Sequence, residues 1–136
     1  MDRRSFLIAT GAVLALPRTS FAAALQYQPG MVGDRLKNGE TVFLDFTATW
    51  CSTCQAQGRV INALKAANPA YEQAITFIDV DWDSYKGDAL TKSLRIPRRS
   101  TLVVLKGDKE LGRIIAQTSE SAIKSLMDTA LAAATG

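Results

Sequence analysis

Histidine is absent from this 136-residue chain, and cysteine occurs only twice. Without histidine, the chain cannot build a serine–histidine or cysteine–histidine nucleophile or a histidine-ligated zinc site. The two cysteines, Cys51 and Cys54, are too close in sequence to join distant parts of a fold. The pair is therefore expected to serve chemistry rather than structure.

A strong excess of one charge is also lacking. The formal net charge is +3, and Arg3, Arg4 and Arg18 supply much of it. Beyond residue 22, thirteen basic residues stand against twelve acidic ones, so the sequence indicates no nucleic-acid partner. Hydrophobic residues make up 47% of the chain and charged residues 21%, which is typical of one folded globular domain.

Residues 1–24 are interpreted as an export signal that is cleaved near residues 22–24. Arg3-Arg4 forms a positive start, residues 6–16 are mostly apolar, and Ser20-Phe21-Ala22 has the small residues of a cleavage site. The apolar stretch is too short to span a bilayer, which takes about 20 residues. We therefore expect a bacterial periplasmic protein that has no stable membrane insertion after cleavage.

The start of this segment points to one export route. Asp2-Arg3-Arg4-Ser5-Phe6-Leu7 is similar to a twin-arginine export signal, although Asp2 stands where serine is usual. An ordinary secretory peptide and an uncleaved membrane anchor are the alternatives. Twin-arginine cargo typically crosses the membrane folded, so the cysteines could arrive reduced.

Hydrophobic patterns beyond the leader predict alternating strands and helices. Residues 25–38 are the weak region, with a hint of a short helix at Arg35-Leu36. Strands are expected over residues 41–47 and 75–80, a hairpin over 101–106 and 110–116, and helices over 51–68, 84–94 and from a Ser119 cap onward. This order favours an α/β fold in residues 25–136, with a central mixed sheet of four to five strands flanked by helices on both faces.

Cys51-Ser52-Thr53-Cys54 stands where the first expected strand gives way to the first expected helix. Free N–H groups and the helix dipole at a helix N-terminus favour a thiolate on the first cysteine. Two intervening residues let the second sulfur reach the first. Cys51 is therefore expected to be the exposed nucleophile, and Cys54 to resolve the mixed disulfide.

Together with its flanks, this motif resembles the active site of the thioredoxin family. Trp50 through Cys54 resembles the site itself, residues 44–51 the strand that leads into it, residues 77–81 the next central strand, and residues 96–113 the closing hairpin. The resemblance covers about residues 35–135. It implies a thioredoxin-like fold, thiol–disulfide exchange with protein disulfides, and no cofactor. We expect a monomer.

The resemblance assigns a base to the second cysteine. Asp45, six residues before Cys51, would be the buried carboxylate that takes the proton from Cys54; its plain alternative is a carboxylate at a strand end. The lysine that partners this aspartate in the family is replaced by Phe77. We therefore expect Asp45 to lose a cationic neighbour and to have a raised pKa.

The resemblance also places substrate contacts and redox tuning. Ser52 and Thr53 replace the Gly-Pro that is usual between the cysteines, so both are expected to tune the reduction potential, in a direction that the sequence leaves open. A hydroxyl of either could donate a hydrogen bond to the thiolate. The residues expected to contact substrate are Trp50, Arg99, Ser100 and Thr101.

The cis-proline that lies opposite the cysteines in the family is missing in the register that we prefer. That register places Ser100 there, with a trans peptide bond, because a cis bond without proline costs about 3–4 kcal/mol. An alternative register makes Pro97 the cis residue. Without the proline, metal ions could gain access to the thiolates.

These inferences favour a periplasmic protein-disulfide reductase or electron carrier. An oxidising compartment would keep the pair oxidised, so a membrane thiol electron donor is expected as a partner. The alternative is a metal or Fe–S carrier that uses Cys51 and Cys54 from two chains, since one chain offers too few ligands for a metal site of its own. A third possibility is a dedicated partner in a single maturation pathway.

Overall fold

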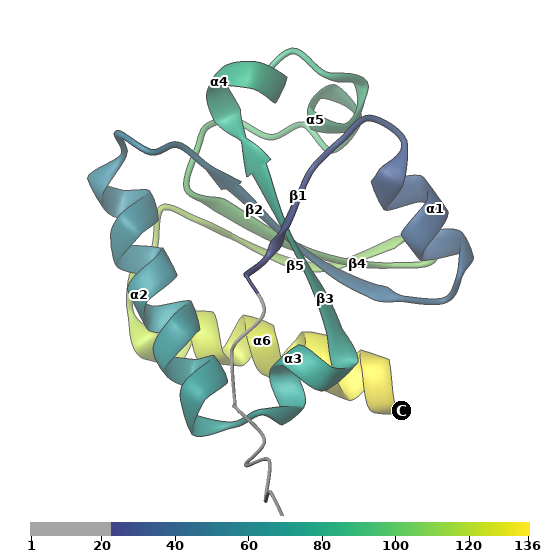
Figure 1. The fold of residues 1–136 in the computed structure, drawn as a ribbon, viewed down its shortest axis with the longest axis vertical. Helices are drawn as coiled ribbons and strands as arrows, with labels where there is room; N and C mark the ends of the chain where they lie inside the picture. Colours follow the sequence, from purple (N-terminus) through teal and green to yellow (C-terminus); the bar gives the residue numbers. More distant parts are fainter. Residues whose placement is uncertain (1–22) are drawn as a thin grey trace, which may run out of the picture.

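Eleven helices and strands follow one another in residues 23–136, the part of the chain that the structure, a computed structural model, describes (Figure 1). All but the last two residues of the expected export signal lie outside this range. In chain order the elements are β1 (Leu25–Gln26), α1 (Met31–Lys37), β2 (Thr41–Thr47), α2 (Ser52–Ala67), α3 (Ala70–Ala74), β3 (Ile75–Asp81), α4 (Trp82–Tyr85), α5 (Ala89–Ser93), β4 (Thr101–Lys106), β5 (Lys109–Ile115) and α6 (Glu120–Thr135).

The five strands form one mixed sheet in the order β1-β3-β2-β4-β5. β1 and β2 pair in parallel with β3, whereas β4 runs antiparallel to β2, and β5 antiparallel to β4. β2 lies at the centre of the sheet, and its sequence Thr-Val-Phe-Leu-Asp-Phe-Thr is buried along almost its whole length. The carboxyl end of this central strand leads directly into the cysteine motif.

Helices cover both faces of the sheet. Strand side chains alternate between the faces, and both faces carry apolar residues that the helices bury. Phe43 packs on one side with residues of α2, α3 and α6, while its neighbours Val42 and Leu44 pack on the other side with residues of α1. Figure 1 shows α2, α3 and α6 together on one side and α1 on the other. The predicted fold class is therefore confirmed.

The long helix at the C-terminal end begins where the sequence predicts. Ser119 Oγ accepts a hydrogen bond from the backbone N–H of Ala122 at 3.3 Å, which caps α6. The apolar residues spaced three and four apart along this helix, including Ile123 and Met127, are buried against the sheet. In the described part of the chain, no helix has the length and apolar character needed to cross a membrane.

The prediction of a single helix over residues 84–94 is wrong. The chain forms two short helices there, α4 and α5, separated by a turn that contains Gly87. A carboxylate caps the start of each helix: Asp81 is the N-cap of α4, and Asp88 accepts from the N–H of Leu90 at 3.1 Å at the start of α5. The short elements β1 and α3, two and five residues long, were not predicted from the sequence.

Candidate active site

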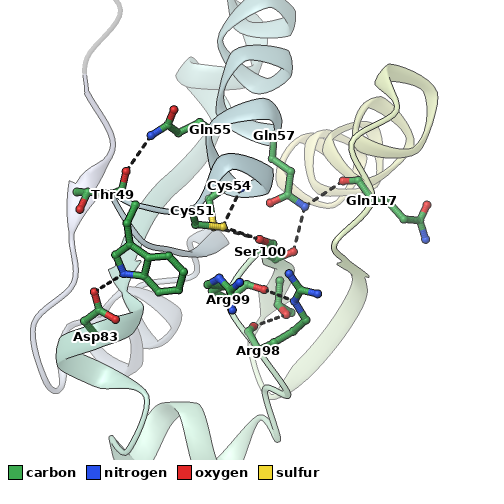
Figure 2. Close-up of a disulfide and its surroundings, with 12 residues drawn as sticks. Thr49, Cys51, Cys54, Gln55, Gln57, Asp83, Arg98, Arg99, Ser100 and Gln117 are labelled. Atoms are coloured by element: carbon green, nitrogen blue, oxygen red, sulfur yellow. Dashed lines mark hydrogen bonds between the residues drawn. A yellow bond between two sulfur atoms is a disulfide. The ribbon is translucent and has the colours of Figure 1, made fainter.

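Cys51 and Cys54 form a disulfide at the junction of β2 and α2, with their Cα atoms 5.3 Å apart (Figure 2). Cys51 is the N-cap residue of α2, and its Sγ accepts a hydrogen bond from the backbone N–H of Cys54 at 3.1 Å. The first sulfur therefore lies at the leading end of a helix, where the dipole and a free N–H stabilise negative charge.

The expectation of an exposed Cys51 is wrong for the disulfide form. Only 3% of Cys51 and 2% of Cys54 are exposed. Both cysteines pack in a small apolar cluster with Ala48 and the half-buried Trp82. Trp82, which the sequence analysis did not single out, directly follows β3, and β3 lies beside β2 in the sheet.

Ser100 lies against the disulfide, immediately before β4. Its Oγ is 3.2 Å from Cys51 Sγ and 3.0 Å from Cys54 Sγ. Because a disulfide sulfur carries no hydrogen, the hydroxyl is the donor in these contacts. Residues 23–136 contain no cis peptide bond, so the alternative register with a cis Pro97 is wrong and Ser100 is joined by a trans bond.

The backbone of Ser100 is fully engaged within the protein. Its N–H donates to Phe46 O at 2.7 Å, and its carbonyl accepts from the N–H of Ala116 at 2.9 Å and from Gln57 Nε2 at 3.0 Å. The same Gln57 nitrogen also donates to Gln117 O at 2.9 Å (Figure 2). Ser100 is fully buried and has a φ of 66°. Its contact with substrate stays a prediction.

Three further predicted site residues, Thr101, Ser52 and Thr53, differ in burial and in hydrogen bonding. Thr101 is fully buried, and its hydroxyl donates to Arg98 O at 2.7 Å, which closes the loop. Its contact with substrate stays a prediction. Ser52 is exposed and Thr53 is half-buried. Within the described chain, neither hydroxyl forms a hydrogen bond to a sulfur. Ser52 and Thr53 stand where the family usually has Gly-Pro, and their effect on the reduction potential stays a prediction.

Trp50 and Arg99 form the solvent-facing side of the site. Trp50 is 58% exposed, and its Nε1 donates to Asp83 Oδ2 at 2.7 Å. The guanidinium carbon of Arg99 lies 4.5 Å from the centroid of the Trp50 ring system, the geometry of a cation–π contact. Both side chains stand where an approaching substrate would meet them, and their contact with substrate stays a prediction.

Asp45 is the buried carboxylate of the site. It is 9% exposed, and its Oδ1 has no hydrogen-bond partner among the described residues. Burial, reinforced by the charge of Asp79, raises the pKa of Asp45 from 3.8 to about 8, while Lys65 opposes the rise. The predicted direction is confirmed. Asp45 and Cys54 line the same cavity of about 410 Å³, which leaves room for water between carboxylate and sulfur.

The family relationship follows from comparison with known proteins. The Thioredoxin family model matches residues 28–129, three quarters of the chain. The chain belongs to the thioredoxin family.

Individual thioredoxins are related at moderate identity. The chain is 26% identical to a thioredoxin of Mycolicibacterium smegmatis over 98 residues, which cover 72% of this chain and 85% of that protein. A putative thioredoxin-4 of Dictyostelium discoideum is 27% identical over 97 residues, 71% and 86% of the two chains. The crystal structure of Trxlp from Edwardsiella tarda superposes with a TM-score of 0.66 at 28% identity and covers 76% of this chain and 98% of that one.

A thioredoxin domain with its cysteine pair at the start of α2 is a thiol–disulfide oxidoreductase, and protein disulfides are the substrates of this family. The pair cycles between a dithiol and the disulfide seen here. No group of three or more potential metal ligands occurs in residues 23–136. A metal or Fe–S site that uses Cys51 and Cys54 from two chains would need ligands from a second copy, and it stays a prediction.

In this thioredoxin the cation near the buried aspartate comes from a helix. The expectation that Asp45 loses its cationic neighbour is wrong: Lys65 of α2, only 4% exposed, acts on its charge. Lys65 Nζ lies 3.9 Å from the centroid of the Phe77 ring and 3.6 Å from Glu72 Oε1. The ring that replaces the family's lysine therefore supports a lysine from the neighbouring element.

The sequence contained a signal for the missed residues of α2. Gln57 and Lys65 lie four residues before and after Ile61, and all three are buried on the face of α2 that packs on the sheet. Polar residues on the predicted apolar face of a helix need partners, because an unpaired buried polar group is costly. That spacing could have singled out both residues for a role near the site.

Proposed function

We propose that this thioredoxin is an exported, periplasmic protein-disulfide reductase that works as a monomer and receives electrons from a membrane thiol donor. The observation that carries the direction is the placement of Asp45 on the same cavity as Cys54. In the reducing direction Cys54 must lose a proton before it attacks. A carboxyl with a pKa of about 8 is well matched to a thiol, whose ordinary pKa is about 8.5.

The reduction proceeds by two exchanges. The Cys51 thiolate attacks one sulfur of the substrate disulfide; that S–S bond breaks, a mixed disulfide forms, and the first substrate sulfur leaves as a thiolate that takes up a proton. Cys54 then gives its proton, through water in the cavity, to Asp45 and attacks the Cys51 sulfur. The Cys51–Cys54 disulfide forms and the second substrate thiol leaves, so two electrons have passed to the substrate.

Two groups stabilise the attacking thiolate. The N–H of Cys54 and the hydroxyl of Ser100 both lie within hydrogen-bond distance of the Cys51 sulfur, at 3.1 Å and 3.2 Å. No histidine stands between the cysteines to stabilise the thiolate further, and α2 leads through α3 directly to β3, with no inserted helical domain such as disulfide-introducing relatives carry. Both features support reduction over oxidation.

The direction is tested by the reduction potential of the Cys51–Cys54 pair together with an insulin reduction assay. We expect turnover of insulin disulfides and a potential well below the strongly oxidising value of about −120 mV. A potential near that value, without insulin reduction, would overturn the proposal. Trapping with Cys54→Ser, which leaves mixed disulfides unresolved, should capture the natural substrates and the electron donor.

Export rests on the leader sequence and needs its own test. Paired Arg3 and Arg4, the apolar stretch of residues 6–16 and Ser20-Phe21-Ala22 support cleavage and a periplasmic location. N-terminal sequencing of the protein from its native cells should give a start near Ala23 or Leu25. An intact Met1 on the fractionated protein contradicts cleavage. Replacing Arg3 and Arg4 by lysine should stop export if the twin-arginine route is used.

A further inference from the structure

We propose that Arg99 and Arg98 form an anion-binding edge beside the disulfide and that the preferred substrates are protein disulfides flanked by aspartate or glutamate. The inference rests on the proposed reductase function and names its substrate class. It is carried by the position of Arg99, by the absence of carboxylate partners for the two arginines, and by the geometry in which Arg99 is held.

Arg99 lies between a residue that contacts the disulfide and the exposed indole of Trp50. Arg99 directly precedes Ser100, whose hydroxyl lies 3.2 Å from Cys51 Sγ and 3.0 Å from Cys54 Sγ. On its other side, the guanidinium stacks on the exposed Trp50. Figure 2 shows Arg98 and Arg99 next to Ser100 on the same side of the disulfide. Residues that flank a substrate cystine would therefore lie within reach of both arginines.

Among residues 23–136, neither arginine has an acidic partner. Arg35, Arg113 and two lysines form ion pairs, but in the part of the chain described no carboxylate oxygen lies within 4.0 Å of a nitrogen of Arg98 or Arg99. Arg98 uses its Nε to donate to Arg99 O at 3.0 Å, whereas the buried Nε of Arg99 has no partner among the described residues. A guanidinium without a carboxylate partner at this place can donate its N–H groups to an anionic ligand.

The carboxylate of Asp83, on the other side of Trp50, already has a hydrogen-bond partner. Asp83 accepts from Trp50 Nε1 at 2.7 Å, and the ring of Trp50 stands between this carboxylate and Arg99. Trp50 thus separates a negative edge from a positive one. A substrate would place its carboxylates on the arginine edge and its apolar residues on the exposed indole.

The geometry of Arg99 suits the carboxylates that a protein substrate carries. A guanidinium presents a rigid planar set of N–H donors that matches a carboxylate with two parallel hydrogen bonds. Stacking on Trp50 fixes the plane of Arg99 beforehand, so less side-chain freedom is lost on binding. Arg98, one residue away, adds a second positive charge that attracts an acidic segment over a longer range.

The experiment uses three short peptides with the same internal disulfide, which carry glutamate, glutamine or lysine on both sides of each cysteine. The reduced protein is mixed with each peptide and kcat/KM is measured. This value is divided by the second-order rate constant with which a small neutral thiol reduces the same peptide, which corrects for the intrinsic reactivity of each peptide disulfide. We expect the glutamate peptide to react about tenfold faster than the lysine peptide after this correction, as one charge-assisted contact can provide. High salt should shrink the ratio.

Substitutions at Arg99 then test whether this residue causes the preference for the glutamate peptide. Arg99→Gln should bring the ratio of glutamate to lysine peptide close to one, and Arg99→Lys should keep part of it. Lys109→Gln is the matched control: it removes the same charge from an exposed residue at the other end of the β4–β5 hairpin, about 20 Å away by strand length. We expect this control to leave the ratio unchanged.

Each outcome bears on one claim. Equal corrected rates for the three peptides in the unaltered protein, or a full preference that survives in Arg99→Gln, would overturn the anion-binding edge. The glutamine peptide reports the reductase function by itself: if it is reduced without any preference for glutamate, only this inference fails. If no peptide is reduced, the proposed function fails. A preference for free glutathione disulfide over every peptide would assign the same edge to a small anionic disulfide and reject the protein substrate class.

Discussion

Ser100 holds a backbone conformation that the family's proline could not adopt. Its φ of 66° lies in the left-handed region, and its N–H donates to Phe46 O at 2.7 Å. Proline fixes φ near −65° and has no N–H to donate. The backbone of this loop therefore differs from one that could hold a proline, so the difference from the family is more than the exchange of one side chain.

We therefore expect Ser100→Pro to damage the fold rather than to restore a family feature. The substitution should lower the free energy of unfolding by more than about 1 kcal/mol, because the native φ and the hydrogen bond are both incompatible with proline. Ser100→Gly, which accepts a positive φ, is the matched control and should be much less affected. Urea unfolding of both variants makes the comparison. Equal stabilities would contradict this account of the loop.

The Ser100 hydroxyl should also set the acidity of the nucleophile. In the reduced protein, Ser100→Ala removes a donor that lies 3.2 Å from the Cys51 sulfur in the disulfide form. We expect the pKa of Cys51 to rise by about one unit, as the loss of a hydrogen bond to a charged group predicts. Ser52→Ala removes an exposed hydroxyl from the same motif and serves as the control. Titration of thiolate absorbance distinguishes the two variants. A larger shift in Ser52→Ala would contradict the role of Ser100 and make Ser52 the main group that sets the pKa of Cys51.

At the scale of a single element, helix α2 places two functional residues on its buried side: the resolving thiol of Cys54 and the amide of Gln57. Gln57, one turn after Cys54, is fully buried and donates to the carbonyls of Ser100 and Gln117. It thereby ties the start of the helix to the loop before β4 and to the segment before α6. The Gln57 amide therefore acts together with the backbone bonds from Ser100 N–H to Phe46 O and from Ala116 N–H to Ser100 O in holding this loop against the start of the helix.

Replacing that amide should loosen the site and the fold together. We expect Gln57→Leu to lower the free energy of unfolding by about 1–3 kcal/mol, since it leaves buried carbonyl groups short of a donor. Gln55→Leu makes the same chemical change two residues earlier, at an exposed position, and should cost less than about 0.5 kcal/mol. Equilibrium unfolding in urea measures both. Indistinguishable variants would show that Gln57 anchors nothing.

The elements that the sequence predicted well are those with long, regular apolar patterns. β2, the β4–β5 hairpin and α6 were found within a few residues of their observed bounds. β2 and β4 are buried along almost their whole length, and α6 buries one apolar face against the sheet. The break between α4 and α5 was missed because Asp88 competes locally as a helix cap, which an apolar pattern does not register. β1 is too short to have a pattern at all and exists only by pairing with β3.

The site was predictable where it depends on spacing along the chain and unpredictable where it depends on contacts across the fold. The cysteine pair at the start of α2 and the buried Asp45 follow from local sequence and from the family resemblance. The proximity of Lys65 to Asp45, by contrast, arises from helix-to-sheet packing. The burial of Cys51 likewise depends on Trp82, which comes from another strand end.

At the scale of the whole molecule, the buried carboxylate links stability to pH. The pKa of Asp45 is raised from 3.8 to about 8 in the folded protein, mainly by burial. Between these values the folded state holds a proton that the unfolded state has lost, so the free energy of unfolding falls as pH rises from about 4 to about 8 and levels off above that range. Asp79, whose pKa is also raised by burial, acts in the same direction.

Asp45→Asn should remove this dependence, because asparagine keeps the shape of the side chain without an ionisable proton. We expect the variant to become progressively more stable than the unaltered protein from pH 4 to pH 8, with a gain of several kcal/mol, since each pKa unit corresponds to about 1.4 kcal/mol. Urea unfolding of the disulfide form across this range gives the difference directly and cancels the titration of all other groups. Parallel curves for the two proteins would mean that Asp45 ionises normally in the folded state, and its role as a base for Cys54 near neutral pH would lose its physical ground. If the curves diverge as expected, slower release of substrate from the mixed disulfide in the same variant would connect the stability cost of the buried carboxylate to the step it serves.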